Sequence, residues 1–159
     1  RLRTVTFWTM GSLSTASYRD GLTLLVALAV CGAVLLFSAR ELNAFAVGED
    51  NARSVGVNVK GVKLRVMVTV SVLIGVCVSI GGTIGFVGLV TPHMARLIVG
   101  PNHRRLLPAV LFSGAIFLML TDLAARTIIS PIELPLGVVT SLIGAVLFVV
   151  IFMRTRRVR

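Results

Sequence analysis

The sequence contains few charged, aromatic or cysteine residues. Of its 159 residues, 14% are charged, 6% are aromatic and 56% are hydrophobic, and the mean hydropathy is +0.97. This composition excludes an ordinary soluble globular domain and indicates a membrane protein. Cys31 and Cys77 each lie in an apolar stretch, where a free cysteine behaves as a small hydrophobic residue, so they predict no disulfide framework.

Acidic residues are scarce as well. There are 6 of them against 16 lysines and arginines, and the net charge is +10. The basic residues stand in short clusters at the ends of apolar runs, and the chain has a single Trp and a single Tyr. A nucleic-acid-binding protein is therefore not indicated. The membrane lipid surface is the partner that we predict for this charge.

Motifs of catalytic or metal-binding chemistry are missing from the sequence. It has no phosphate-binding GxxxxGK[ST] loop, no GxSxG elbow, no HExxH pair and no CxxC pair. We therefore expect no enzyme activity, no cofactor and no metal site. His93 and His103 have no acidic residue or cysteine close by in the sequence, and we expect a helix-packing role for His93 and a surface role for His103.

Apolar runs separated by polar turns predict an all-α fold, a polytopic transmembrane helix bundle with about five spans. Residues 1–20 are too polar to span a bilayer and are predicted to lie at the membrane interface, where Trp8 and Tyr18 are typical. Pro108 fits the fixed-φ start of the fourth span. The predicted spans are residues 22–39, 66–80, 84–99, 108–126 and 136–153.

The apolar stretch of residues 66–95 carries no formal charge. It is too long for one straight span of a hydrocarbon core of ~30 Å and must break. Glycines mark the predicted break, because glycine weakens a helix interior and allows a tight turn. The residues predicted to serve this turn and the close packing of the helices around it are Gly81, Gly82, Gly85, Gly88 and Pro92.

Arginine clusters follow residues 39, 95 and 153. By the positive-inside rule, these clusters lie on the cytoplasmic side of the membrane. The polar turn at residues 100–105 and the C-terminus are then cytoplasmic. The segment 127–135, which holds two prolines and Glu133, is predicted at the outer surface.

Residues 40–65 interrupt the apolar pattern with charges of both signs and with glycines, and we predict a cytoplasmic loop with short helices. Its segment 49–55 is bounded by glycines, begins with two acidic residues and carries Arg53 later, the charge order that a helix dipole favours. From these residues alone, a solvated loop beside the membrane and a partner-binding surface are both open interpretations.

Asp122 and Arg126 lie four residues apart in the fourth predicted span. An Asp at the bilayer centre costs about 2.5–3.5 kcal/mol, so Asp122 should lie near a helix end or have a partner. Two interpretations are open. The residues form an internal ion pair that seats the end of the helix, or Arg126 is an outward-facing recognition charge.

Several long motifs resemble one known family, the permeases of ATP-binding-cassette importers for ferric siderophores, haem and cobalamin. The resemblance covers nearly the whole chain, and its motifs follow one another in the family's order. They are WTMGSLS (8–14), LNAFAVGEDNARSVGVNV (42–59), GFVGLVTPHMARLIVGPNHRRLLP (85–108), DLAART (122–127) and ELPLGVVTSLIGAVLF (133–148).

The resemblance implies a bacterial cytoplasmic-membrane permease of ten helices that works as a homodimer or pseudo-dimer. Its implied partners are two cytoplasmic ATPase subunits, on which ATP hydrolysis takes place, and an extracytoplasmic substrate-binding protein. Residues 1–159 correspond to the C-terminal half, with the end of the fifth helix at residues 1–17. By the same match, Arg126 meets the binding protein, and the family's ATPase-coupling loop falls on Gly48, Glu49, Asp50, Ala52, Arg53 and Gly56.

Two alternatives to such an importer are a secondary transporter driven by an ion gradient and a non-transporting membrane anchor or assembly protein. The first predicts acidic residues near the bilayer midplane, and apart from Asp122 the predicted spans lack them. The chain begins without Met, and we expect it to be a piece of a longer protein with further helices upstream.

Overall fold

The computed structural model describes residues 9–14, 16–128 and 134–156. In this part of the chain all regular structure is helical, which confirms the all-α prediction. The helices are α2 (Tyr18–Phe37), α3 (Ala39–Phe45), α4 (Glu49–Ser54), α5 (Val59–Gly81), α6 (Val87–Val99), α7 (His103–Thr127) and α8 (Leu136–Arg156).

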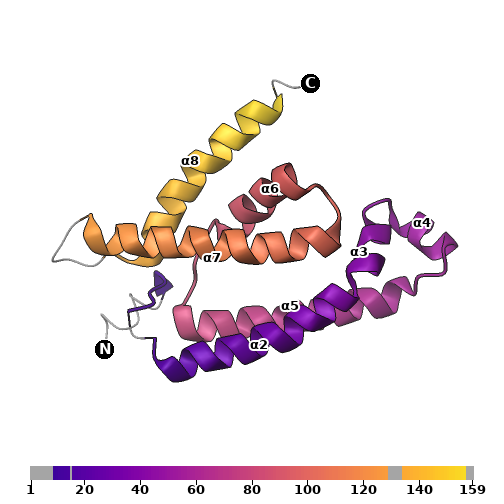
Figure 1. Cartoon of the computed structure of the whole chain (residues 1–159), viewed down its shortest axis with the longest axis horizontal. Helices are drawn as coiled ribbons and strands as arrows, with labels where there is room; N and C mark the ends of the chain where they lie inside the picture. The colour runs from indigo at the N-terminus through magenta and orange to yellow at the C-terminus, as the bar shows by residue number, and fades with distance from the viewer. Residues whose placement is uncertain (1–8, 15, 129–133, 157–159) are drawn as a thin grey trace.

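The long helices form two pairs and one crossing helix (Figure 1). Helices α2 and α5 pack against each other along their lengths, and α6 packs against α7. Helix α8 contacts both α6 and α7 and runs obliquely away from them. The short helices α3 and α4 lie at one end of this arrangement, where α3 contacts α7 and α4 contacts α3 and α5.

Within the described residues, three helices are long and apolar enough to cross a membrane. They are α2 with 20 residues, α5 with 23 and α7 with 25. Helix α6, with 13 residues, is about 20 Å long and cannot cross a ~30 Å hydrocarbon core by itself. The described helices are those of a multi-pass membrane protein, and the five predicted crossings and their sides stay a prediction.

Three helices begin earlier in the sequence than their apolar runs do, because a polar side chain caps each of them. Ser17 and Asp20 form a capping box that starts α2 at Tyr18 rather than at the predicted residue 22. The Asn58 side chain accepts a hydrogen bond from the Gly61 N–H over 3.1 Å. Helix α5 therefore begins at Val59, and the prediction that the loop extends to residue 65 was wrong.

The start predicted for the fourth span at Pro108 was also wrong. The Asn102 side chain accepts a hydrogen bond from the Arg104 N–H over 3.1 Å and starts α7 at His103. Pro108 lies inside the helix, as its sixth residue. Proline has no N–H to donate to the carbonyl four residues earlier, and its ring crowds that carbonyl, which here belongs to Arg104 in the first turn. Helix α7 therefore continues through Pro108.

The uncharged stretch breaks at the glycines. Helix α5 ends at Gly81, and Gly82 has φ +68°. Helix α6 begins at Val87 rather than at the predicted residue 84, because Phe86 has φ +64°, outside the helical region. Such a backbone conformation is uncommon for a residue with a side chain.

Residues that precede α2 form hydrogen bonds with backbone and hydroxyl groups near this break. The Ser12 N–H donates to the Gly81 carbonyl over 3.1 Å, and the Gly137 N–H donates to the Met10 carbonyl over 3.0 Å. The Thr83 hydroxyl donates to the Thr9 carbonyl over 2.6 Å. Unpaired peptide groups are costly at membrane depth, so these bonds stabilise the end of α5 and the start of α8.

Small residues let α8 approach its neighbours closely. A Cβ on Gly137 would lie 2.1 Å from the Met10 carbonyl oxygen, and a Cβ on Gly144 would lie 2.4 Å from the Phe86 Cβ. An apolar cluster of Ala125, Leu136 and Val139 joins the end of α7 to the start of α8. Close approach at small residues is the usual packing mode of membrane helices.

The predicted positions at the chain ends are only partly described. Helix α8 runs to Arg156, past the predicted end at residue 153. Residues 1–8, with Trp8, and residues 129–133, with Glu133, lie outside the described part of the chain, as do residues 157–159 of the C-terminal arginine cluster.

Candidate functional site

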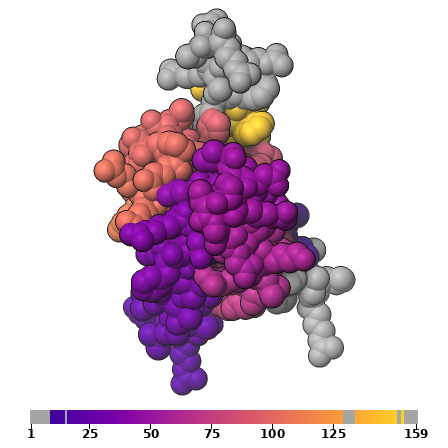
Figure 2. All heavy atoms as spheres, turned by 90° about the vertical axis from the view of Figure 1, so that its right-hand side faces the viewer, coloured from indigo at the N-terminus to yellow at the C-terminus, as the bar shows by residue number. Residues whose placement is uncertain are grey.

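The segment from α3 to α4 forms an exposed surface at one end of the molecule. In Figure 2 these residues, coloured purple to magenta, face the viewer beside the orange residues of α7. Two ion pairs attach the segment to α5. Lys63 pairs with Glu49 of α4, and Arg65 Nη1 lies 3.3 Å from Oε2 of Glu41 on α3.

Helix α4 is framed by two glycines whose backbone conformation excludes most other residues. Gly48 has φ +118° and Gly56 has φ +85°. A Cβ would meet no close neighbour at either position, so the requirement for glycine comes from φ and not from space. Ala52 is fully buried, and its carbonyl accepts a hydrogen bond from the Val57 N–H over 3.0 Å. Residues 49–54 of the predicted loop thus form a short helix with defined ends.

The charged residues predicted for this site lie on its surface. Glu49, Asp50 and Arg53 are all exposed. The Lys63 ammonium group, which donates a hydrogen bond to the Glu49 carboxylate, lowers the pKa of Glu49 below its ordinary value. Glu49 therefore combines two functions, since it holds α4 against α5 and contributes negative charge to the surface.

Two apolar residues beside α4 were missed by the sequence analysis. Val47 is 70% exposed and Val55 is 72% exposed, and they lie on either side of the helix. Exposed apolar side chains rimmed by charges are typical of a protein-binding surface. Nothing in the sequence distinguishes these valines from those inside the spans.

A polar cluster attaches α3 to the first residues of α7. The Asn43 side chain donates a hydrogen bond to Asn102 Oδ1 over 3.0 Å and accepts one from the His103 N–H over 2.8 Å. The His103 ring is half-buried, with Nδ1 2.7 Å from Asn43 Oδ1. The surface role expected for His103 was therefore wrong. His93 is exposed in the described part of the chain, and the helix-packing role expected for it stays a prediction.

Asp122 and Arg126 lie at the opposite end of α7 from this cluster. Arg126 Nε donates a hydrogen bond to Asp122 Oδ2 over 2.9 Å, and the side chains are 46% and 31% exposed, respectively. The internal ion pair, one of the two interpretations of these residues, is therefore present. Its partial exposure leaves the Arg126 side chain accessible to a partner as well.

The glycines predicted for the helix turn differ in what they contact. A Cβ on Gly81 would lie 3.2 Å from a methyl carbon of Leu13, and a Cβ on Gly85 would lie 3.5 Å from the Ser141 hydroxyl. Around Gly88 nothing lies within 4 Å, so no contact of the described chain explains that glycine. Pro92 lies inside α6.

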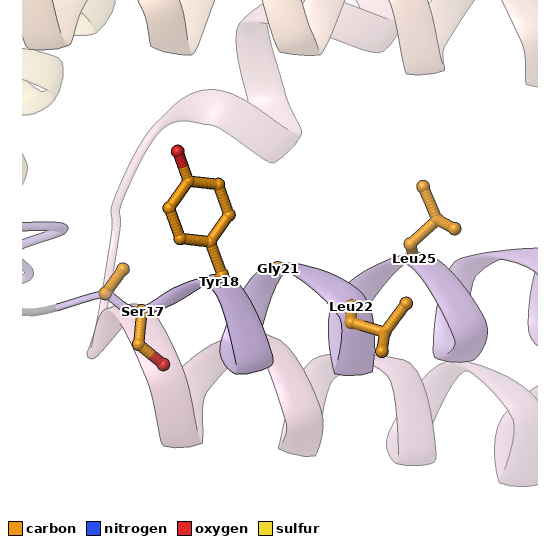
Figure 3. A pocket seen from close by; sticks show the side chains of 6 residues that line it. Ser17, Tyr18, Gly21, Leu22 and Leu25 are labelled. Carbon is orange, nitrogen blue, oxygen red and sulfur yellow. The ribbon is translucent and has the colours of Figure 1, made fainter.

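The hollows on the described surface do not resemble an enclosed ligand site. One lies at the start of α2, and all of its lining residues come from that single stretch. Tyr18 and Leu25 point to the same side of the helix in Figure 3, and Tyr18 is fully exposed. Among the described residues, no group of His, Cys, Asp and Glu side chains could hold a metal ion.

A second hollow lies where three separate segments meet near the break between α5 and α6. Its walls are formed largely by small and polar residues. They are Thr9, Met10, Thr83, Gly85, Gly137, Val138 and Ser141.

Comparison with known protein families assigns these features to a class of protein. The family model described as the FecCD transport family matches residues 1–154. The chain belongs to the FecCD transport family. This match covers both the loop segment and α7, and it confirms the resemblance described above.

Curated relatives of this FecCD-family chain are described as permease proteins of transport systems. The chain is 44% identical over 153 residues to an uncharacterised ABC transporter permease of Bacillus subtilis, 96% of this chain and 43% of the relative. It is 42% identical to a hemin transport system permease of Yersinia pestis, over 100% of this chain and 48% of the relative. A vitamin B12 import system permease of Vibrio vulnificus is 42% identical, over 97% of this chain and 46% of the relative.

The fold is also that of a solved member of this class. An ABC transporter described as being of metal-chelate type, in an inward-facing conformation, matches with a TM-score of 0.91 and 36% sequence identity. The match covers 96% of this chain and 49% of the solved chain. The FecCD-family chain thus spans about half the length of the relatives that it matches.

Proposed function

We propose that this chain is the C-terminal half of the membrane-spanning subunit of an ATP-binding-cassette importer. In that function it forms part of the translocation path for a ferric siderophore, haem or cobalamin. The observation that carries the proposal is the family match over residues 1–154, in a chain whose fold has a TM-score of 0.91 to an ABC transporter. The chain itself has no catalytic role, and ATP is hydrolysed on a partner subunit.

The partner ATPase docks on the surface formed by α3 and α4. Support comes from the shape and chemistry of that surface, on which Val47 and Val55 offer apolar contacts beside exposed charges. These contacts are presented by α4, to which Glu49, Asp50, Ala52 and Arg53 belong and which Gly48 and Gly56 flank. Rigid presentation reduces the ordering cost of binding, and the segment is held by hydrogen bonds from Asn43 to the start of α7 as well as by the ion pairs to α5.

The extracytoplasmic binding protein docks at the other end of α7. Arg126 is the residue that we assign to this contact, because its guanidinium group is partly exposed at the end of a long helix. Helix α7 is about 37 Å long, enough to reach from one membrane surface to the other. The C-terminus and the α3–α4 segment are then cytoplasmic.

A second permease subunit covers the apolar surfaces that this half leaves open. The described face of α2 at Leu22 and Leu25 is exposed, with 64% of each side chain accessible. In a membrane such a face contacts lipid or another helix. Assembly into a homodimer or pseudo-dimer brings two translocation halves together.

Reconstituted uptake tests the proposal directly. The assembled transporter that contains this chain is placed in proteoliposomes with its ATPase and binding protein, and uptake of haemin, cyanocobalamin and a ferric hydroxamate siderophore is measured. We expect uptake of at least one probe that requires ATP and is stopped by vanadate. Uptake driven by an ion gradient without ATP would contradict the proposal.

A further inference from the structure

The polar cluster of Asn43, Asn102 and His103 joins segments that are about sixty residues apart in sequence. It connects α3, on the proposed ATPase-docking surface, to the first turn of α7, and the two helices are in contact. No charge is needed for this connection, and each residue contributes hydrogen bonds. Its residues belong to two of the motifs described above, 42–59 and 85–108, but nothing in the sequence pairs them with each other.

Backbone donors fix the orientation of both amide side chains. Asn102 Oδ1 accepts from the Arg104 N–H over 3.1 Å, and Asn43 Oδ1 accepts from the His103 N–H over 2.8 Å. Both acceptors are therefore oxygen atoms, and Asn43 Nδ2 is the donor toward Asn102 Oδ1. His103 Nδ1 must carry a proton, because the Asn43 Oδ1 atom that it contacts can only accept.

The cluster also completes the start of α7. The first N–H groups of a helix have no partner inside the helix. Asn102 caps the N–H of Arg104 from the usual position before the helix, whereas the N–H of His103 is capped from a different helix, by Asn43. Separating α3 from α7 would leave this N–H and the His103 ring without their acceptor.

The two ion pairs of the same surface form a softer connection. The side chains of Lys63 and Glu49 are 51% and 47% exposed, and those of Arg65 and Glu41 are 53% and 33% exposed. Exposed pairs between long side chains are weak and are screened by salt. The Asn43 cluster is partly buried, and its side chains are shorter than those of the ion pairs. It is the stiffer of the two attachments.

We propose that Asn43, Asn102 and His103 are positioning residues for transport, through which movement of the α3–α4 surface reaches α7. The inference rests on the proposed function, in which an ATPase moves that surface. Because α7 is one continuous helix of 25 residues that carries the Asp122–Arg126 pair near its other end, a shift at His103 is carried to the opposite end of the helix. The hydrogen bonds between Asn43, Asn102 and His103 stay formed while the α3–α4 surface and α7 move together.

The test measures coupling in the assembled transporter, as molecules of haemin, cyanocobalamin or ferric hydroxamate siderophore taken up per ATP hydrolysed. Asn43→Ala removes all three contacts to the α7 start. We expect this ratio to fall about fivefold or more, the factor that corresponds to one net hydrogen bond of ~1 kcal/mol, while ATP hydrolysis continues. An unchanged ratio would overturn the inference.

A pair of substitutions at His103 separates positioning from folding. His103→Asn places an amide N–H close to the position of Nδ1 and should keep coupling near that of the native protein. His103→Ala removes the donor and should lower coupling. If Asn43→Ala prevents assembly, this pair decides, and equal coupling in the two variants would overturn the inference.

A readout without a transported ligand separates this inference from the proposed function. Cys31 and Cys77 are the free cysteines of the described chain, and after both are replaced by Ser, a spin label is attached at Leu123→Cys on α7. ATP with vanadate should change the label's spectrum in the native background and leave it unchanged with Asn43→Ala. The same change in both backgrounds would contradict the link. If the native transporter takes up none of the three probes but its spin label still responds to ATP with vanadate, only the proposed function is contradicted.

Discussion

Arg126 Nε lies 2.9 Å from Asp122 Oδ2, one helical turn earlier on α7. The arginine proposed to meet a binding protein is therefore already paired within its own helix. An exposed pair of this spacing contributes only about 0.3–0.5 kcal/mol. The pair holds the guanidinium group in place, and a partner carboxylate can compete for it at small cost.

The first prediction concerns this residue. Arg126→Glu should weaken docking of the binding protein, since it reverses the charge at the contact and places two carboxylates one turn apart. The effect should be largest at low ionic strength, because salt screens exposed charges. Affinity is measured at low and high salt with the assembled transporter. Asp122→Asn is the matched control, which removes the internal competitor and should preserve affinity; equal affinity for Arg126→Glu would remove this role.

The second prediction concerns the charges of the α3–α4 surface. Glu49→Lys together with Arg53→Glu should lower uptake per ATP hydrolysed, because it reverses the exposed charges and sets two ammonium groups against each other at Lys63. Uptake and ATP hydrolysis are measured in proteoliposomes. Glu49→Lys with Lys63→Glu is the control, since it restores the internal pair. If uptake per ATP hydrolysed falls as far in the control as in the first variant, the coupling depends on the surface charge and not on the internal pair. Full coupling of the first variant would remove both roles.

The third prediction concerns the exposed valines. Val55→Asp should reduce co-purification of the ATPase in detergent, because a charge would be buried in an apolar contact without a partner. Val47→Asp should act in the same direction. Ser54→Asp adds the same charge to a neighbouring exposed position and should have a smaller effect. Undiminished co-purification of both valine variants would place the ATPase contact elsewhere.

A pH dependence follows from the Glu49–Lys63 pair. The pKa of Glu49 is lowered in the folded protein, so the stability that the pair adds is fully present above the unfolded value of 4.5 and is lost as the pH falls through the lower folded value. The protection factors of the α4 amides, which correct for the intrinsic pH dependence of exchange, should therefore decrease below about pH 4.5 by this route. Glu49→Gln should remove that step from the profile. A step of the same size in the Gln variant would assign it to another group.

The fifth prediction concerns the contact between α8 and Phe86. Gly144→Ala should destabilise the protein by about 1–3 kcal/mol, because the new Cβ would lie 2.4 Å from the Phe86 Cβ. Gly88→Ala is the matched control, since a Cβ at that position meets nothing within 4 Å and alanine favours a helix over glycine by up to about 1 kcal/mol. Thermal unfolding in detergent compares the two. A midpoint for Gly144→Ala at or above that of Gly88→Ala would contradict the predicted contact.

Hydropathy located the helices but not their ends. Long uncharged runs predict spans because the bilayer demands them, and α2, α5 and α7 follow these runs. Their first residues depend instead on single capping side chains, such as Ser17 and Asn58, that lie outside the apolar runs. For these three helices, the start predicted from hydropathy therefore falls several residues inside the observed helix.

The candidate site was predicted only where local sequence determines it. The glycines and charges around α4 act within a few residues of one another, and their pattern is visible in the sequence. The contact of Asn43 with His103 depends on the packing of α3 against α7, and the contact of Gly144 with Phe86 depends on the path of α8. A single sequence carries no signal for either of these tertiary contacts.

Residues 9–12 have a consequence for how such a permease can be divided. Through Thr9, Met10 and Ser12 they satisfy backbone or hydroxyl groups at the end of α5, in the following link and at the first turn of α8. A gene cut just before Tyr18 would leave those groups without these hydrogen-bond partners, although every later helix would still be encoded. An engineered split of the protein should therefore cut the chain before Thr9, so that residues 9–12 stay on the same polypeptide as α5 and α8, whose backbone groups they bind.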